Sequence, residues 1–263
     1  MWEWTSGADV IQNILRNTTL IWSGNSVRRH TFMYFSNVLE GKQQRVGNAS
    51  NSTSVLDWYD RDLEKKMCPK DAIDAATFSY DKPGCSSGCC GACSCATSVH
   101  GLQQYFVWQQ QWFDAQLKSV WENLISVAGP KKIVLVMNAG LILAWTKREG
   151  SLPILIQEAV GLKEFITNLP DHVSVIYLKS SKVSDVDMDS QNMFMRAQDA
   201  VLEMIFRTIT PMKKQPIVVD LYEMTRKRID FVDSNHYTGR SSEVEIDMIL
   251  HVLHYAHRYR TRI

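Results

Sequence analysis

The sequence predicts an α/β domain with a mainly parallel sheet and helices on both of its faces, a three-layer α/β/α arrangement. Two observations predict it. Strand-like and helix-like patterns alternate along the chain, and several strand candidates are apolar at every position, as strands buried on both faces are. With 263 residues, 45% hydrophobic and 22% charged, the chain is long enough to form one domain with a full core.

The N-terminal elements are predicted to be a helix, a strand, a turn and a second helix. Apolar residues at helical spacing mark a short helix over 10–15, and the β-branched, apolar run 18–22 marks a strand. A tight turn over 23–26 leads into a helix over 27–39, which ends before Gly41. The chain therefore passes from a buried strand through a sharp turn into a helix.

The middle of the chain continues this alternation. Residues 104–108 form a strand candidate, and apolar side chains at helical spacing over 112–125 predict an amphipathic helix that Gly129 ends. The run 133–137 is apolar throughout and predicts a strand buried on both faces.

The C-terminal part adds two more strand candidates and three helices. A helix over 153–168 precedes a buried strand over 173–178, and a long helix over 190–209 precedes a strand over 217–221. The sequence 242–245, Ser-Glu-Val-Glu, is a capping box and predicts the start of the last helix.

Residues 42–100 interrupt the alternation with a polar, irregular stretch that we expect to be an insertion in the single domain. All six cysteines lie between Cys68 and Cys95, most of them in a run rich in Gly and Ser. The even number and the clustering favour disulfide bonds. The alternatives are free thiols or a structural metal site that includes His100, although the spacing matches no standard zinc pattern. In none of these interpretations is a cysteine the nucleophile.

Charge and short motifs bear on partners and location. The chain has 29 basic and 28 acidic side chains, so nucleic acid is not an expected partner. Glycosylation sequons begin at Asn17, Asn48 and Asn51, whereas the N-terminus lacks the pattern of a signal peptide. We expect the lumen of the secretory pathway or the extracellular space if a targeting segment is missing from this sequence, and assign no location otherwise.

Ser26 follows the first predicted strand and begins the second predicted helix. A serine at this position has its hydroxyl at a strand end and its backbone N–H at a helix N-terminus, where negative charge is stabilised. These are the needs of an acyl-transfer nucleophile with an oxyanion site. The alternative is an ordinary N-cap serine, which is a common feature of helices.

Asp233 and His236 form a D-x-x-H sequence before the last helix. This spacing lets the carboxylate hold Nδ1–H of the imidazole, which leaves Nε2 free to take a proton from a serine. Alone, the pair would favour an ordinary surface loop with an unrelated Asp and His. Together with Ser26, it completes the set of groups that a serine hydrolase requires.

The order of these motifs resembles the SGNH/GDSL hydrolase superfamily, and within it the PC-esterase branch. That branch includes plant trichome-birefringence-like polysaccharide O-acetyltransferases and the sialate O-acetyltransferase domain. The resemblance is carried by 20–29 (a strand, then Gly-Asn-Ser and Arg), by the aromatic stretch 105–113, by 134–140 with its Asn-x-Gly, and by Asp233 and His236. It spans almost the whole chain apart from the insertion.

The resemblance implies a flavodoxin-like SGNH fold and a role for each matching residue. Ser26 would be the nucleophile, His236 the general base and Asp233 the residue that orients it. Arg29 is expected to be structural and to tie down the loop carrying Asp233. The residues expected at the oxyanion or substrate-binding site are Asn25, Asn138 and Gly140. The chain departs from the pattern at Asn25, where the family has Asp, and at Leu141-Ile142, where plant members have His-Trp.

The resemblance therefore implies a carbohydrate O-acetyl esterase or O-acetyltransferase that acts through an acyl-enzyme. Its partners would be an acetylated carbohydrate or acetyl donor, with no cofactor and no metal ion. The alternative is a catalytically degenerate protein of the same fold, with a structural or glycan-binding role in a larger assembly. The two departures and the elaborate insertion favour that alternative.

Overall fold

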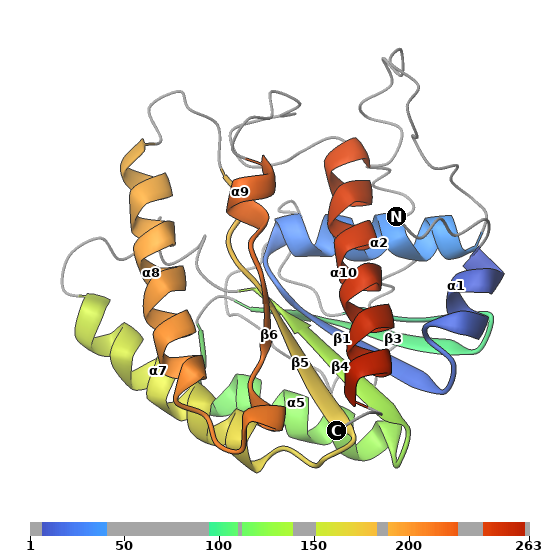
Figure 1. The fold of residues 1–263 in the computed structure, drawn as a ribbon, viewed down its shortest axis with the longest axis horizontal. Helices are drawn as coiled ribbons and strands as arrows, with labels where there is room; N and C mark the ends of the chain where they lie inside the picture. Colours follow the sequence, from blue (N-terminus) through green and yellow to red (C-terminus); the bar gives the residue numbers. More distant parts are fainter. Residues whose placement is uncertain are drawn as a thin grey trace, which may run out of the picture.

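A six-stranded sheet forms the middle layer of the computed structural model, which describes residues 7–40, 95–109, 112–138, 151–182, 189–225 and 239–260 (Figure 1). The strands are β1 (Thr18–Gly24), β2 (Cys95–Val99), β3 (Leu102–Trp108), β4 (Lys132–Met137), β5 (Val173–Leu178) and β6 (Ile217–Val219). They lie in the order β2-β3-β1-β4-β5-β6, so β1 is interior to the sheet.

All neighbouring strands are parallel except β2, which is antiparallel to β3. Without β2, the remaining strands lie in the order 2-1-3-4-5, which is the flavodoxin-like doubly wound order. The expected fold class is thus confirmed. In such sheets the connections leave β1 and β4 in opposite directions, and ligands bind in the crevice outside the carboxyl ends of these two strands.

Helices cover both faces of the sheet. They are α1 (Gly7–Asn13), α2 (Ser26–Leu39), α5 (Ala115–Ala128), α7 (Ser151–Asn168), α8 (Asp189–Arg207), α9 (Leu221–Thr225) and α10 (Gly239–Arg260), with a 3₁₀ helix at Met212–Lys214. One hydrophobic core joins α1, α2 and α10 to the sheet, and the other joins α5, α7 and α8 to it. Within the described ranges, no helix is both long and apolar enough to cross a membrane.

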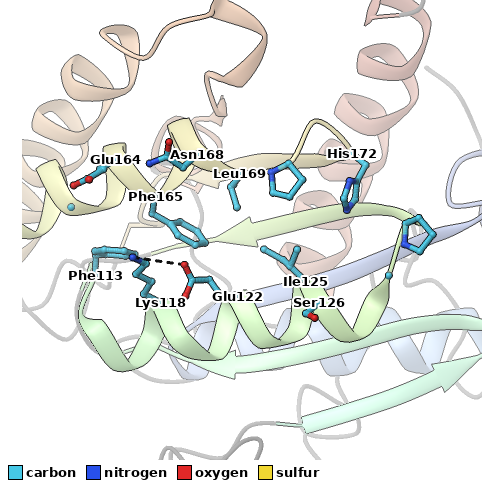
Figure 2. Close-up of a pocket in the computed structure, with 14 residues that line it drawn as sticks. Phe113, Lys118, Glu122, Ile125, Ser126, Glu164, Phe165, Asn168, Leu169 and His172 are labelled. Carbon is cyan, nitrogen blue, oxygen red and sulfur yellow. Dashed lines mark ion pairs between the residues drawn. The ribbon is translucent and has the colours of Figure 1, made fainter.

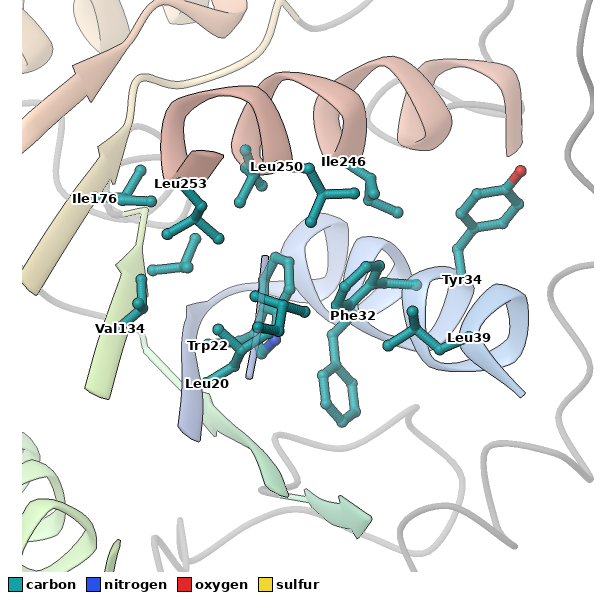
Figure 3. Packing of buried hydrophobic residues seen from close by; sticks show 14 of the residues in the cluster. Leu20, Trp22, Phe32, Tyr34, Leu39, Val134, Ile176, Ile246, Leu250 and Leu253 are labelled. Atoms are coloured by element: carbon teal, nitrogen blue, oxygen red, sulfur yellow. The ribbon is translucent and has the colours of Figure 1, made fainter. Parts of the chain in front are cut away.

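The alternating side chains of β1 supply both cores. Leu20 and Trp22 face α2 and α10, whereas Ile21 belongs to the opposite core. The ring of Trp22 lies 5.7 Å from that of Phe35, and apolar residues of α10 such as Leu250 close this core from above (Figure 3). The first core therefore fixes α2 and α10 over the same strand.

Strand β1 is longer than the sequence predicts. It continues to Gly24, and only Asn25 separates it from α2, so the predicted turn over 23–26 is wrong. The parallel neighbours β3 and β4 pair with β1 as far as Gly24 and Ser23, which holds these residues in the sheet. The residue types that predict a turn here, Gly, Asn and Ser, instead form a direct junction between the strand and the helix.

Strand β6 is shorter than the predicted strand over 217–221. It ends at Val219, and α9 begins at Leu221. Asp220 separates the two elements, and its Oδ1 accepts a hydrogen bond of 3.1 Å from the backbone N–H of Glu223. A side-chain acceptor at this position favours the start of a helix over continuation of the strand.

Strand β2 lies within the stretch 42–100, which the sequence predicts to be irregular. A two-residue turn joins it to β3, with φ of 48° at His100 and 83° at Gly101, as in type I′ hairpin turns. The small side chains of β2 give no apolar signal, so the His-Gly pair is the cue that could have revealed the hairpin. The other five cysteines and the side chain of Cys95 lie outside the described residues, and the disulfide bonds stay a prediction.

Helix α5 provides a test of the local structure. It begins at Ala115, later than predicted, because Asp114 caps it: Oδ1 accepts a hydrogen bond of 2.7 Å from the backbone N–H of Leu117. Asp114→Ala should lower the free energy of unfolding by about 1 kcal/mol, whereas Asp114→Asn keeps an acceptor and should stay within about 0.5 kcal/mol of wild type. Urea denaturation measures both values, and an alanine variant as stable as wild type would contradict the cap.

Candidate active site

Ser26 occupies the first position of α2, directly behind the end of β1. Asn25 is the N-cap: its Oδ1 accepts a hydrogen bond of 3.0 Å from the backbone N–H of Val27, and its carbonyl accepts one of 3.0 Å from that of Arg29. The alternative in which Ser26 itself caps the helix is therefore wrong. Its backbone N–H belongs to the first turn, which carries the positive end of the helix dipole.

Asn25 stands where the pattern that the sequence resembles has an aspartate, and its role in the structure is that of a helix cap. Capping requires a side-chain oxygen that accepts a hydrogen bond, and asparagine provides it as well as aspartate does. Asn25 is buried, and this oxygen is engaged with Val27. Asn25 therefore supplies the cap without the negative charge that an aspartate would carry.

The residues after β3 and β4 flank this turn. The backbone N–H of Gln109 donates to the carbonyl of Gly24 at 2.8 Å, and that of Asn138 donates to the carbonyl of Ser23 at 3.0 Å. Ser26 thus follows β1 at the carboxyl edge of the sheet, and Asn138 follows β4 at the same edge. This is the edge of the sheet at which doubly wound folds bind their ligands.

The side chain of Asn138 spans the ends of two strands. Its Nδ2 donates a hydrogen bond of 2.7 Å to the carbonyl of Leu178 at the end of β5, and the residue is buried. An amide has two N–H groups, so one remains for the oxyanion role expected from the sequence. That role stays a prediction.

Three of the expected site residues, Gly140, Asp233 and His236, lie outside the described residues. The structure describes the elements that flank the Asp233–His236 segment: α9 ends at Thr225 and α10 begins at Gly239. The proximity of this pair to Ser26 therefore stays a prediction, as does their action as a triad.

An ion pair that the sequence analysis missed lies next to Ser26. Arg28 donates two parallel hydrogen bonds to Glu245 of α10, from Nη1 to Oε2 at 2.7 Å and from Nη2 to Oε1 at 3.0 Å. Both residues are almost fully buried, with exposed fractions of 2% and 1%. Thr31 Oγ1 donates to Glu245 at 2.9 Å, and Ser181 Oγ donates to it at 3.1 Å.

Glu245 has a different role from the one that the capping box predicts. Helix α10 begins at Gly239, so the box over 242–245 lies inside the helix and does not start it. The carboxylate of Glu245 instead faces α2 and pairs with Arg28. The ion pair joins residues far apart in the sequence, and its only local cue is a glutamate on the apolar face of the last predicted helix.

Arg29 is also buried, and its guanidinium carbon lies 5.7 Å from the centroid of the Trp108 ring. A cation over an aromatic face is a favourable contact, and it attaches α2 to the end of β3. The expected bond from Arg29 to the loop carrying Asp233 falls on residues outside the described ranges. A structural role for Arg29 is thus in keeping with its burial, while its partner on that loop stays a prediction.

Gly24 leaves room for the Arg28 side chain. A Cβ atom at Gly24 would lie 2.4 Å from Cγ and 2.7 Å from Cβ of Arg28. The guanidinium is held by Glu245 and Ser181, so this side chain cannot move aside freely. The glycine of the Gly-Asn-Ser sequence is therefore required by a close approach.

A second buried polar cluster lies at the carboxyl end of β5. Tyr177 Oη donates to Asp199 Oδ1, and the backbone N–H of Ser180 donates to Asp199 Oδ2 at 2.8 Å. Burial raises the pKa of Asp199 to about 7, although the hydrogen bonds from Tyr177 and Ser180 and the charge of Lys179 act in the opposite direction. Asp199 thus changes charge near neutral pH.

A groove of ≈ 640 Å³ lies elsewhere, between α5 and α7 (Figure 2). Gly129 and Pro130, just before β4, and His172, just before β5, line one part of it, so this part lies at the amino ends of the strands, whereas Ser26 follows the carboxyl end of β1. Its lining also contains Ser126, but among the described residues no hydrogen bond joins Ser126 to His172. This groove is therefore a poor candidate for acyl transfer.

The described ranges contain no group of three or more His, Cys, Asp or Glu able to hold a metal ion.

No protein-family model and no curated protein matches the chain. Among solved structures, it is similar to an acetylxylan esterase from Geobacillus stearothermophilus, with 12% identity over 89% of this chain and 93% of that chain and a TM-score of 0.47. It is also similar to the acetyl xylan esterase AlAXEase, with 11% identity over 88% of this chain and 97% of that chain and a TM-score of 0.45. At these values the likeness assigns neither an activity nor site residues to this chain.

The shifted pKa of Asp199 predicts how stability depends on pH. Its pKa is about 7 in the folded protein against 3.8 ordinarily, so the folded state holds this proton more tightly than the unfolded state. Protonated Asp199 therefore stabilises the folded state. This stabilisation is complete below about pH 4 and is lost as the pH rises to 7. Relative to Asp199→Asn, which cannot ionise, wild type should lose about 2–3 kcal/mol of unfolding free energy between pH 5 and pH 8. Denaturant titrations at both pH values measure this difference, and parallel pH profiles would contradict it.

Proposed function

We propose that the chain is a serine O-acyl esterase or O-acetyltransferase of SGNH type that acts on an acetylated carbohydrate. The observation that carries the proposal is the position of Ser26. It begins α2 immediately behind the interior strand β1, at the carboxyl edge of the sheet where β1 and β4 are neighbours and the strand order reverses. The carbohydrate class and the PC-esterase branch rest on the sequence resemblance.

In the proposed reaction, Ser26 Oγ attacks the carbonyl carbon of an acetyl ester while Nε2 of His236 takes the hydroxyl proton. Asp233 holds Nδ1–H and stabilises the imidazolium. The C–O bond to the sugar then breaks, His236 returns the proton to the leaving sugar oxygen, and an acetyl-Ser26 intermediate remains. Water or a second sugar hydroxyl, deprotonated by His236, attacks the acetyl carbonyl carbon, the bond to Ser26 Oγ breaks, acetate or an acetylated sugar leaves, and His236 returns the proton to Ser26 Oγ.

The first turn of α2 supports stabilisation of the oxyanion. The backbone N–H of Ser26 lies at the positive end of the helix dipole, where developing negative charge is favoured. Asn138, at the end of the neighbouring strand β4, is the proposed side-chain donor, with Gly140 beyond it. Because one N–H of Asn138 already donates to Leu178, only its other N–H can serve this purpose.

A glycan-binding protein without turnover is the second candidate function. The observation that favours it is at Asn138, where one N–H already donates to the carbonyl of Leu178, so the side chain can offer only a single donor to an oxyanion. The two functions differ in one respect that can be measured. The enzyme releases acetate or transfers the acetyl group to another hydroxyl, whereas the binding protein leaves the acetylated glycan unchanged.

Hydrolysis of 4-nitrophenyl acetate by wild type and four variants tests the proposal. Ser26→Ala, His236→Ala and the double variant should each lose at least about 10³-fold in kcat/KM, with the double variant hardly worse than either single one. Asp233→Asn should retain more activity, because the imidazole keeps a hydrogen-bond partner.

His172→Ala serves as the matched control, because free imidazole side chains hydrolyse activated esters slowly and His172 lies in the distant groove. It should keep the wild-type rate. Equal slow rates of hydrolysis in wild type and all variants would contradict the proposal. An acetylated xylooligosaccharide, with or without a sugar acceptor, then separates esterase from transferase activity by measurement of released acetate.

A further inference from the structure

We propose that Arg28 and Glu245 are a positioning pair, which fixes α2, the helix that begins with Ser26, relative to α10, the helix that follows Asp233 and His236 in the sequence. The inference rests on the proposed function. Arg28 lies two residues after Ser26 in the first turn of α2, and Glu245 lies in α10, which begins three residues after His236. The pair thus joins the helix that begins with Ser26 to the helix that comes directly after the Asp233–His236 segment in the sequence.

Three residues donate hydrogen bonds to the carboxylate of Glu245 and hold it in place. Oε2 accepts from Arg28 at 2.7 Å and from Thr31 at 2.9 Å, and Oε1 accepts from Arg28 at 3.0 Å and from Ser181 at 3.1 Å. Arg28 Nη2 also donates to Ser181 Oγ at 2.9 Å. The cluster therefore joins α2, α10 and the segment after β5 at the carboxyl edge of the sheet.

Packing alone would hold α2 and α10 together. Ile246, Leu250 and Leu253 of α10 already belong to the same hydrophobic core as Phe32 and Phe35 of α2 (Figure 3). Apolar contacts are tolerant of small shifts along a helix, whereas a forked guanidinium–carboxylate bond has one geometry. What the ion pair adds to this core is the register between the two helices.

Burial makes the pair a poor device for stability alone. Desolvation of two charges offsets most of their attraction, and apolar residues of similar volume often stabilise a protein equally well. A misplacement of about 1 Å at a catalytic group can, by contrast, reduce the rate about 10²-fold. Precise placement of the catalytic groups is therefore the property that depends most on this pair.

The test compares kcat and KM of Glu245→Gln and Arg28→Lys on 4-nitrophenyl acetate, at a temperature where every variant is folded by circular dichroism. We expect kcat to fall at least 10-fold in both, with KM within about twofold of wild type. Glutamine keeps the shape of the side chain without its charge, and lysine keeps the charge without the fork. Unchanged kcat in both variants would overturn the inference.

Leu202→Ala is the control for a general loss of stability. Leu202 is fully buried in the opposite core, so its truncation lowers the melting temperature without touching the ion pair. Its kcat should stay within about twofold of wild type. An equal fall of kcat in Leu202→Ala would show that destabilisation alone explains the effect. If Glu245→Gln does not fold, Ser181→Ala removes one hydrogen bond from the carboxylate and should lower kcat by a smaller factor.

A readout that is independent of turnover separates this inference from the proposed function. The imidazole ¹⁵N and ¹H signals of His236, assigned with His236→Asn, should shift in Glu245→Gln but stay in place in Leu202→Ala. If wild type hydrolyses no ester, the proposed function fails, and the His236 signals still decide the positioning role. Unshifted His236 signals in Glu245→Gln would overturn it.

Discussion

A guanidinium of α2 and a carboxylate of α10 meet in the interior, and the carboxyl edge of the sheet is arranged around them. Neither charge could be buried alone, so Glu245 accepts two hydrogen bonds on each oxygen and Arg28 passes over a glycine to reach it. The first turn of α2 also contains Arg29, which is buried, at the positive end of the helix dipole. The carboxylate of Glu245 lies beside this turn and offsets its charge.

The parallel sheet explains why chemistry would be concentrated at this edge. Parallel strands point their carboxyl ends in the same direction, and the strand order reverses at β1 and β4, which is where doubly wound folds bind their ligands. Backbone hydrogen bonds from Gln109 and Asn138 to the end of β1 hold the junction before Ser26 in place. A serine placed here needs little local adaptation to become a nucleophile, because the helix start already favours negative charge beside it.

The elements that can be predicted from the sequence are those with strong local patterns. The buried strand predicted over 173–178 has these bounds in the structure, and α2 and α7 begin within two residues of their predicted starts. Strand β2 was missed because its mostly small side chains form no clear strand pattern in the sequence. What holds it in the sheet is its backbone pairing with β3. The Arg28–Glu245 pair was missed because no local pattern relates residues in the second and the last helix. The family spacing drew attention to Arg29 instead, and both arginines are buried, which a run of basic residues does not indicate.

Reaction with a fluorophosphonate probe, followed by mass spectrometry of the peptide that contains Ser26, tests the central claim most directly. An activated serine attacks the phosphorus of such a probe and is modified covalently, whereas an ordinary helix-terminal serine is not. We predict modification at Ser26 in wild type and its loss in His236→Ala. The absence of modification at Ser26, or equal labelling of several serines, would contradict the assignment of Ser26 as the nucleophile.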